Sequence, residues 1–153
     1  MENNSIRNNL KILSANVRGM RTNLGDLSHT AIRSGADIVI CCETFLYESV
    51  PPTYGQIQGY THWYRRDRSG QGGGIAVCHK RDLRVQCLNI EIPEALEIMF
   101  LKIFVNKEES ILLTACYRPQ WQGSAPLEFL WDSLDTIGTD KSWLLQCTDC
   151  WRS

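Results

Sequence analysis

The sequence predicts an α/β fold with two β-α-β units and an antiparallel stretch between them. In the first unit, an apolar strand at 10–15 leads through a helix-like segment to a second strand at 36–42. In the second unit, strands at 110–117 and 142–147 flank another helix-like segment. A crossover of this kind makes its two strands parallel and is almost always right-handed. The carboxyl ends of each pair are therefore expected to lie at the same edge of a sheet.

Local patterns predict the remaining elements. Residues 1–9 are polar and rich in Asn, which is typical of disorder. Apolar residues at helical spacing predict a helix near 23–34, ended by Gly35, and another over 126–137. Alternating apolar segments between these helices predict strands, which are 60–66, 73–79, 84–91, 96–105 and 110–117. The glycines at 72–74 are expected to form a close backbone approach or a turn, because no helix follows to make a phosphate cradle.

Polar side chains follow the strands of both units. Asn16 and Glu43 follow the first pair, Tyr117 and Arg118 end the third strand, and Asp149 follows the fourth. Open α/β sheets bind ligands at the carboxyl ends of their strands, so we expect these side chains to converge on one site. A carboxylate and an amide suit a hard cation such as Mg²⁺ together with a phosphate. Each residue also has a purely structural alternative, as a strand cap, turn former, edge aromatic or surface charge.

Composition limits the possible partners. The chain has 153 residues, enough for one domain, and its 16 Lys and Arg against 17 Asp and Glu give a formal charge of −1. Nucleic-acid binders normally carry a basic surplus. A local basic cluster could contact phosphates or form a solvated hairpin surface, and both interpretations stay open; it comprises Arg65, Arg66, Arg68, Lys80, Arg81 and Arg84.

The cysteine and tryptophan residues indicate the compartment and the core. The polar start resembles no signal peptide, and no apolar run is long enough to span a membrane. Seven cysteines without such a signal favour reduced thiols in an intracellular protein, with the nucleus as one candidate. Trp63, Trp131 and Trp143 are expected in the core, with five cysteines inside strands: Cys41, Cys42, Cys78, Cys87 and Cys116. The Cys147–Cys150 pair has zinc-like spacing, but no second pair follows.

Four motifs in series carry a family resemblance. They are Ser14–Gly19, Ala36–Thr44, Gly72–Val77 and Leu113–Pro119. In this order they resemble the N-terminal part of the endonuclease/exonuclease/phosphatase superfamily, which includes apurinic/apyrimidinic endonucleases and pancreatic deoxyribonuclease. The basic run Arg65–Arg68 and the Tyr-Arg-Pro ending most resemble the endonuclease domain of non-long-terminal-repeat retrotransposons. The resemblance implies a two-sheet α/β sandwich of the deoxyribonuclease type over 10–153, with the C-terminal half missing.

The resemblance also implies roles for individual residues. Asn16 would orient the scissile phosphate or the attacking water, and Glu43 would bind Mg²⁺ or Mn²⁺. Tyr117 would hydrogen-bond the phosphate, with Arg118 holding the substrate nearby. The implied reaction is metal-assisted hydrolysis of a DNA phosphodiester, with no other small-molecule cofactor. In a full-length element, such a domain would be fused to a reverse transcriptase.

Other parts of the family pattern are absent. Where the family has Gly-Asp-x-Asn, this chain places Cys147 at the Asp position and Asp149 at the Asn position. A slipped register puts Asp149 at the Asp position but lengthens the strand by two residues, so Asp149 is kept as a catalytic candidate. The Ser-Asp-His motif of the family would lie beyond Ser153, and it is open whether residues after Leu145 belong to the ancestral domain.

These observations leave two hypotheses from different classes. The first is a DNA endonuclease domain of a retrotransposon-type protein that is inactive on its own. The second is a non-catalytic remnant that at most binds a cation or nucleic acid. A phosphatase or sphingomyelinase-like phosphodiesterase is a weaker rival, because the Tyr-Arg-Pro ending fits the retrotransposon branch better.

Overall fold

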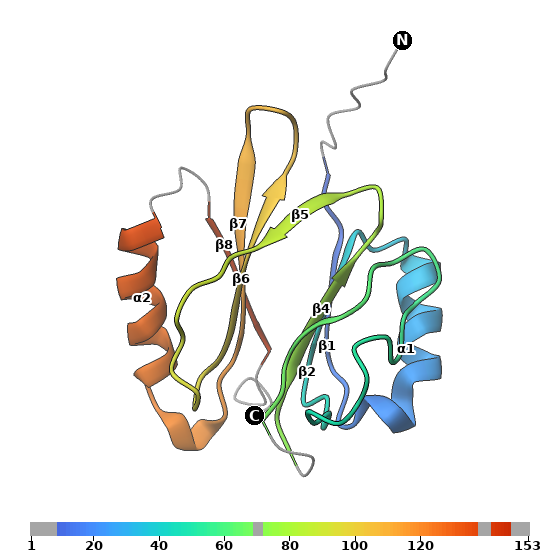
Figure 1. Cartoon of the computed structure of the whole chain (residues 1–153), viewed down its shortest axis with the longest axis horizontal. Coiled ribbons are helices and arrows are strands. Elements are labelled where there is room, and N and C mark those ends of the chain that lie inside the picture. Colours follow the sequence, from blue (N-terminus) through green and yellow to red (C-terminus); the bar gives the residue numbers. More distant parts are fainter. Residues whose placement is uncertain (1–8, 69–71, 138–141, 148–153) are drawn as a thin grey trace.

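Two mixed β-sheets stack face to face, and one helix covers the outer face of each (Figure 1). The structure is a computed structural model that describes residues 9–68, 72–137 and 142–147. The resulting order of layers is helix, sheet, sheet, helix. This two-sheet α/β architecture is the one that the sequence resemblance implied.

The first sheet is built from the N-terminal half of the chain. Its elements are β1 (Ile12–Asn16), α1 (Met20–Ser34), β2 (Ile38–Cys42), β3 (Tyr64–Arg66) and β4 (Ile75–His79), and its strand order is β1-β2-β4-β3. β1 and β2 are parallel, while β4 runs antiparallel to both of its neighbours. Helix α1 ends at Gly35, whose left-handed φ of 66° lets its N–H bond back to the last turn.

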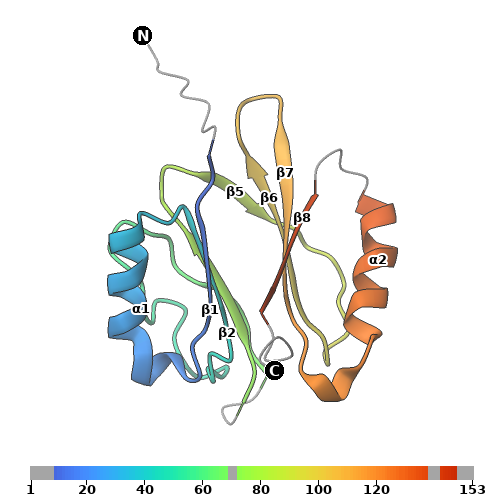
Figure 2. The same ribbon diagram turned by 180° about the vertical axis from the view of Figure 1, so that it is seen from behind.

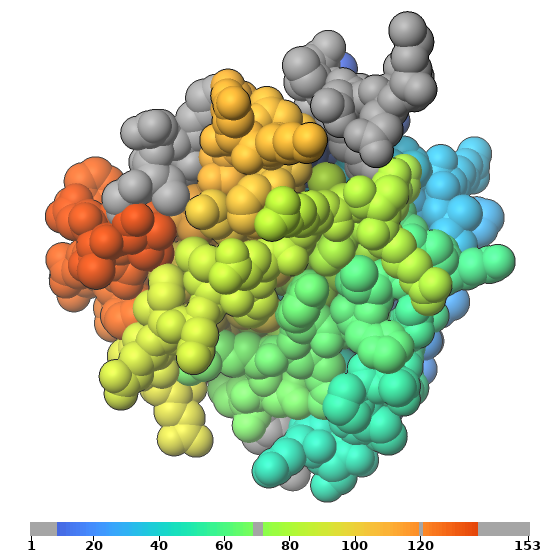
Figure 3. Space-filling model, turned by 45° about the horizontal axis from the view of Figure 1, so that its top comes forward, coloured from blue at the N-terminus to red at the C-terminus, as the bar shows by residue number. Residues whose placement is uncertain are grey.

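The second sheet is built from the rest of the chain. Its elements are β5 (Arg84–Cys87), β6 (Glu97–Phe104), β7 (Ser110–Tyr117), the short 3₁₀ helix η1 (Gln120–Gln122), α2 (Ala125–Ile137) and β8 (Ser142–Cys147). The strands follow one another in chain order. β5, β6 and β7 form an antiparallel meander, and β8 joins β7 in parallel. Figure 3 shows the segment around β5, in yellow-green, crossing between the parts of the chain that form the two sheets.

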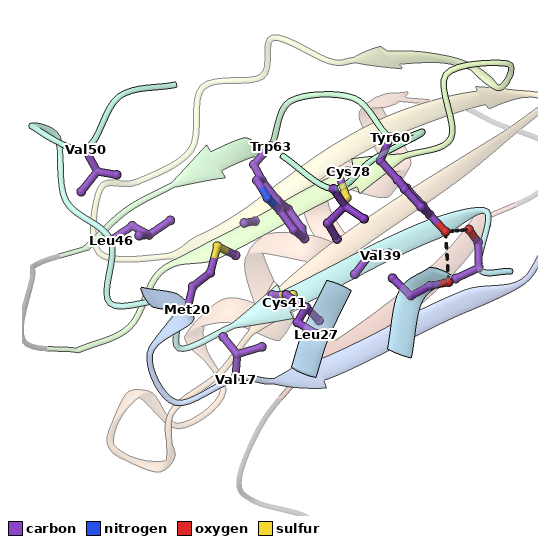
Figure 4. Close-up of a cluster of buried hydrophobic side chains, with 14 residues drawn as sticks. Val17, Met20, Leu27, Val39, Cys41, Leu46, Val50, Tyr60, Trp63 and Cys78 are labelled. Atoms are coloured by element: carbon purple, nitrogen blue, oxygen red, sulfur yellow. Dashed lines mark hydrogen bonds between the residues drawn. The ribbon is translucent and has the colours of Figure 1, made fainter. Parts of the chain in front are cut away.

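Three apolar layers hold these elements together. The central layer lies between the sheets and includes Ile40 from β2 and Leu101 from β6. The second lies between the first sheet and α1, where the Tyr60 hydroxyl is 2.5 Å from the carbonyl oxygen of Ala36 and 3.2 Å from that of Ala31 (Figure 4). The third lies between the second sheet and α2. Burial on both faces explains why β2 and the first four residues of β4 form continuous apolar runs rather than alternating ones.

The structure corrects several expectations. The two β-α-β units lie in different sheets, so their convergence depends on how the sheets stack. Trp131 is 73% exposed because α2 turns Leu130 toward the sheet, and the next residue lies about 100° further around the helix. Cys87 is exposed on β5, although Cys41, Cys42, Cys78 and Cys116 are buried as expected. The strand expected at 84–91 ends at Cys87.

The carboxyl ends of β1, β2 and β7 all point to the same end of the molecule, the lower end in Figure 1. β1 and β8 are the outer strands of their sheets, and they contact each other on one side of the sandwich (Figure 2). Each of these strands is paired on one side only within the described residues. Among the residues that the structure describes, no helix has the length and apolar character needed to cross a membrane.

Candidate functional site

A hydrogen bond between Glu43 and Tyr117 joins the two sheets at their common end. The Tyr117 hydroxyl donates to Glu43 Oε1 over 2.8 Å, although the residues are 74 positions apart in the chain. Tyr117 is the last residue of β7 and is buried, while Glu43 follows β2 and is half-buried. The structure therefore brings together two of the residues that the sequence placed at one site.

Backbone hydrogen bonds fix the position of Glu43 from both sides. The Gly19 N–H donates to the Glu43 carbonyl over 2.8 Å. On the other side, the N–H groups of Thr44 and Phe45 donate to the carbonyls of Gly74 and Gly73. The segment that carries the carboxylate is therefore held between the loop after β1 and the start of β4.

The backbone in this region is strained. Among the described residues, positive φ angles at positions other than glycine occur at Arg18, Glu43 and Phe45, with values of 46°, 54° and 56°. A side chain in the left-handed region costs about 1–2 kcal/mol. Such strain persists only where the surroundings enforce it, and it clusters at functional sites. Its concentration after β1 and β2 independently marks this end of the sheets.

Asn16 lies at the same end of the first sheet, as the sequence predicts. It is the last residue of β1 and pairs with Cys42, the residue before Glu43. Its Oδ1 accepts a hydrogen bond from the Arg18 N–H over 3.3 Å. Asn16 also lines a groove between β1 and α1, together with Asn23 and Asp26. Its amide is therefore placed beside the strand that carries Glu43.

Glu97 is a buried carboxylate at this site that the sequence analysis missed. It begins β6, is directly paired with Tyr117 in the register and is 2% exposed. Its Oε1 accepts a hydrogen bond from the Gly74 N–H, and its Oε2 lies 3.7 Å from Arg68 Nη1. The only sequence indication was a charged residue before four apolar ones at the start of a strand, which is equally typical of an exposed strand end.

The surroundings of Glu97 oppose its ionisation. Burial raises the pKa of this carboxyl above its ordinary value, and the nearby charge of Glu43 raises it further. The Gly74 hydrogen bond and the guanidinium groups of Arg68 and Arg66 oppose this shift only in part. Through its hydrogen bond from the Gly74 N–H, the Glu97 carboxyl fixes the glycine segment. The carbonyls of that segment accept hydrogen bonds from the two residues after Glu43.

The glycine segment makes a close backbone approach, as expected. Gly74 has a φ of +94°, and a Cβ placed there would lie 2.5 Å from Thr44 Oγ1. A Cβ on Gly73 would meet both Arg68 and Glu97. These positions therefore require glycine because of neighbouring side chains rather than a bound phosphate.

Much of the basic cluster is occupied by structural contacts. Arg65 forms a 2.7 Å ion pair with Asp67 and donates to three backbone carbonyls between 47 and 51. Arg66 donates to the carbonyls of Leu96, Ile92 and Pro93, which ties β3 to the loop before β6. Arg84 lies over the Phe104 ring at 4.4 Å. Two of the six basic residues therefore hold loops in place, and a third packs on an aromatic ring.

Of the two remaining predicted site residues, the structure places Arg118 but does not describe Asp149. Arg118 directly follows Tyr117 and donates to the Gly123 carbonyl over 3.3 Å, so it lies at the same end of the molecule. β8 ends at Cys147, which is the register partner of Tyr117. Asp149 and Cys150 lie outside the described residues, so neither the slipped register nor the zinc-like pair is tested.

The site has few protein groups for a metal ion. Within the described part of the chain, no group of three or more His, Cys, Asp and Glu side chains is arranged to hold one. Mg²⁺, however, often uses only one or two carboxylates together with water and substrate phosphates. The half-buried Glu43 carboxylate fits such a cation, and Glu97 is a second carboxyl close enough for the charge of Glu43 to raise its pKa. Glu43 is therefore the residue that would hold a magnesium ion here, with water and substrate phosphates completing its ligands.

Comparison with solved structures identifies the fold. The endonuclease domain of TRAS1, a telomere-specific non-LTR retrotransposon, matches with a TM-score of 0.69 and 16% identity over 90% of this chain and 58% of that one. An AP endonuclease from Archaeoglobus fulgidus matches with a TM-score of 0.69 and 22% identity over 92% of this chain and 57% of that one. The AP endonuclease LMAP from Leishmania major matches with a TM-score of 0.68 and 16% identity over 92% of this chain and 54% of that one.

The chain spans between 54% and 58% of the length of these three proteins. No protein-family model matches the sequence, and no curated protein matches it. The likeness therefore rests on the architecture alone. On this basis, the described part of the chain has the two-sheet α/β fold of these three endonucleases, which is the fold that the sequence resemblance implied.

Proposed function

We propose that this chain is part of a Mg²⁺- or Mn²⁺-dependent phosphodiesterase that acts on DNA, of the kind found as the endonuclease domain of retrotransposon-type proteins. The observation that carries the proposal is the Glu43–Tyr117 hydrogen bond at the common end of the two sheets. It joins a carboxylate and a phenol in a fold shared with the TRAS1 endonuclease domain and with AP endonucleases. A Neisseria 3′ phosphatase bound to a DNA hairpin also matches, with a TM-score of 0.61.

The proposed roles follow from the chemistry of each group. Glu43 holds the metal, which when bound would stabilise charge on the phosphoryl oxygens and the leaving group. Tyr117 has a single phenolic O–H, which donates to the Glu43 carboxylate in the free chain and would donate instead to a phosphate oxygen when substrate binds. The Asn16 amide orients the scissile phosphate or the attacking water, and the Arg118 guanidinium neutralises phosphate charge. Asp149 remains a candidate for orienting the water.

We further propose that the isolated chain does not hydrolyse DNA. The residue paired with Tyr117 at the end of β8 is Cys147, whose thiol is a poor substitute for a carboxylate in orienting water or binding Mg²⁺. Losing members of a cooperating catalytic set typically removes several orders of magnitude in rate. In the proposed setting, the active protein is longer, carries a reverse transcriptase and acts inside the cell, with the nucleus as the place where it meets DNA.

Metal binding tests the role of Glu43 without requiring activity. Titration of Mn²⁺ followed by electron paramagnetic resonance is expected to show binding that Glu43→Gln weakens at least tenfold. The matched control is Glu48→Gln, because Glu48 is an exposed carboxylate five positions along the same loop. Equal affinity in Glu43→Gln and in the parent would refute Glu43 as the ligand.

Plasmid nicking tests the activity. The parent chain with Mg²⁺ or Mn²⁺ is expected to nick supercoiled plasmid no faster than its Glu43→Ala variant. Nicking by the parent that the variant lacks would show that the fragment retains chemistry and would overturn the inactive assignment.

The second candidate function is a non-catalytic remnant, which the thiol-bearing residue at the end of β8 favours. The two candidates differ in what a longer chain would do. A version extended with the sequence that follows in the same transcript should gain nicking if the enzyme proposal is right and should stay inactive if it is a remnant.

A further inference from the structure

Two aromatic side chains at the candidate site are exposed, and each has an arginine over its ring. Trp121, in η1, is 69% exposed, and the guanidinium carbon of Arg68 lies 5.8 Å from its ring centre. Tyr47 is 38% exposed, with the guanidinium carbon of Arg21 at 5.2 Å. Trp121 lies in the loop after β7, which carries Tyr117, and Tyr47 lies in the loop after β2, which carries Glu43. Both loops lie at the lower end of the molecule in Figure 1.

The arginine beside Trp121 is held in place from the protein interior. Arg68 Nη1 lies 3.7 Å from Oε2 of the buried Glu97. The guanidinium therefore contacts a fixed carboxylate on one side and an exposed indole on the other, and it keeps 34% of its side chain exposed. A cation within about 6 Å of an indole centre is attracted to the ring face. Glu97 thus orients Arg68, and Arg68 orients the indole.

The turn that carries Trp121 is also anchored. The Gln122 N–H donates to the Pro119 carbonyl over 3.1 Å, and the Gln122 side chain donates to the Ala95 carbonyl over 2.5 Å. Arg118 donates to the Gly123 carbonyl over 3.3 Å, which closes the turn. An exposed tryptophan on a fixed turn loses little conformational freedom when a ligand stacks on it. These contacts keep the indole at the surface beside the Tyr117 end of the site.

We propose that Trp121 and Arg68 form a stacking platform for an unpaired base of the DNA strand near the scissile phosphate. One face of the indole contacts the Arg68 guanidinium, and the base stacks on the exposed indole surface. The platform rests on the proposed function in one respect, because DNA is taken as the substrate. Beyond the proposed function, the platform would make the site select DNA with an unstacked base, such as a bulge, a mismatch or a single-stranded end.

The charge of the protein favours stacking over phosphate contacts as the source of affinity. Its formal charge is −1, so the chain as a whole has no basic surplus to attract the phosphate backbone. Arg65 and Arg66 are already engaged with backbone carbonyls. Base stacking on an aromatic ring tolerates any base sequence, because every base has a π-face. Binding at this platform should therefore depend on whether a base is unpaired rather than on which base it is.

The chain contains a matched control for this platform. Trp131 on α2 is 73% exposed, comparable with Trp121, but it lies in a different element. Replacing either residue removes an exposed indole of similar accessibility. Differences between Trp121→Ala and Trp131→Ala therefore report the position of the ring rather than the loss of a tryptophan as such.

The experiment measures binding of fluorescein-labelled DNA by anisotropy in the presence of EDTA, so that cleavage cannot contribute. The probes are a fully paired hairpin and the same hairpin with one bulged base. Trp121→Ala is expected to weaken binding of the bulged hairpin roughly tenfold, within the range found for loss of one base–aromatic stack. Trp131→Ala should stay within about twofold of the parent, and Trp121→Phe should recover much of the affinity. Thermal melts of all variants check that they fold.

The outcomes separate the platform from the proposed function. Equal affinities of Trp121→Ala and Trp131→Ala for the bulged hairpin would overturn the platform and leave the Glu43 assignment untouched. The same loss on bulged and paired hairpins would also overturn it, because stacking on an unpaired base would not be the cause. Trp121-dependent binding together with Mn²⁺ binding unaffected by Glu43→Gln would support the platform and overturn the metal assignment.

Discussion

Replacing Gly74 with alanine should disrupt the start of β4 and the segment that holds Glu43. Gly74 has a φ of +94°, and an added Cβ would lie 2.5 Å from Thr44 Oγ1. The left-handed backbone costs about 1–2 kcal/mol for a residue with a Cβ. Forcing an atom into a packed site typically costs a further 1–3 kcal/mol or so. We therefore expect Gly74→Ala to lower the free energy of unfolding by about 2–5 kcal/mol.

Gly59 supplies the control, because it has a similar φ of +88° but no heavy atom within 4 Å of the position of an added Cβ. Gly59→Ala should cost only the backbone contribution, about 1–2 kcal/mol. A second control is the Thr44→Ala background, which removes the colliding oxygen. In that background Gly74→Ala should cost about as much as Gly59→Ala, and the two substitutions should therefore be strongly coupled.

Urea unfolding followed by tryptophan fluorescence measures all five proteins, and thermal melts provide a second readout. The reasoning fails if Gly74→Ala is no more destabilising than Gly59→Ala. It also fails if Gly74→Ala costs the same in the parent and in the Thr44→Ala background, because the collision with Thr44 would then make no contribution.

Three further predictions follow from the same contacts. Burial raises the pKa of Glu97, so the folded state holds this proton more tightly than the unfolded state. The free energy of unfolding of the parent, relative to that of Glu97→Gln, should therefore fall as the pH rises from the ordinary pKa of 4.5 toward the folded-state pKa. Parallel pH profiles of the two proteins would contradict this. Tyr60→Phe should cost about 1–2 kcal/mol in urea unfolding, because the Ala36 carbonyl loses its donor inside the core, and an unchanged midpoint would contradict this. The edge strands β1 and β8 should cause self-association that light scattering detects at high protein concentration. Ser14→Lys, at an exposed position of β1, should reduce it, and a monomeric, sharply cooperative melt would argue against it.

The sequence alone was sufficient to predict the parallel pairs and the position of the candidate site. β1 and β2 pair in parallel, as do β7 and β8, because each pair is separated by a segment with helical periodicity. Asn16 and Glu43 follow adjacent parallel strands, so their shared edge could be inferred from local pattern and the handedness of crossovers. The roles assigned to these residues, and to Tyr117, Arg118 and Asp149, stay predictions.

Side-chain environments were harder to predict. Trp131 and Cys87 were expected in the core, yet both are exposed. Both errors have the same origin, because residue type indicates only which side chains can be buried. The rotation of α2 about its axis decides whether Trp131 faces the sheet, and the path of β5 decides whether Cys87 is covered by other residues. The basic cluster shows the converse, because Arg65 and Arg66 bind carbonyls of distant loops that no sequence pattern connects to them.

The sequence by itself determined the elements, their order and the edge of each sheet that carries polar residues, because these depend on periodicities and turn chemistry within a few tens of residues. Only the tertiary structure decided that the two β-α-β units belong to different sheets, that Tyr117 reaches Glu43 across them and that the buried Glu97 links the glycine segment to Arg68 and Trp121. The physical reason is that the stacking of the sheets is set by the apolar layer between them, to which residues from both halves of the chain contribute.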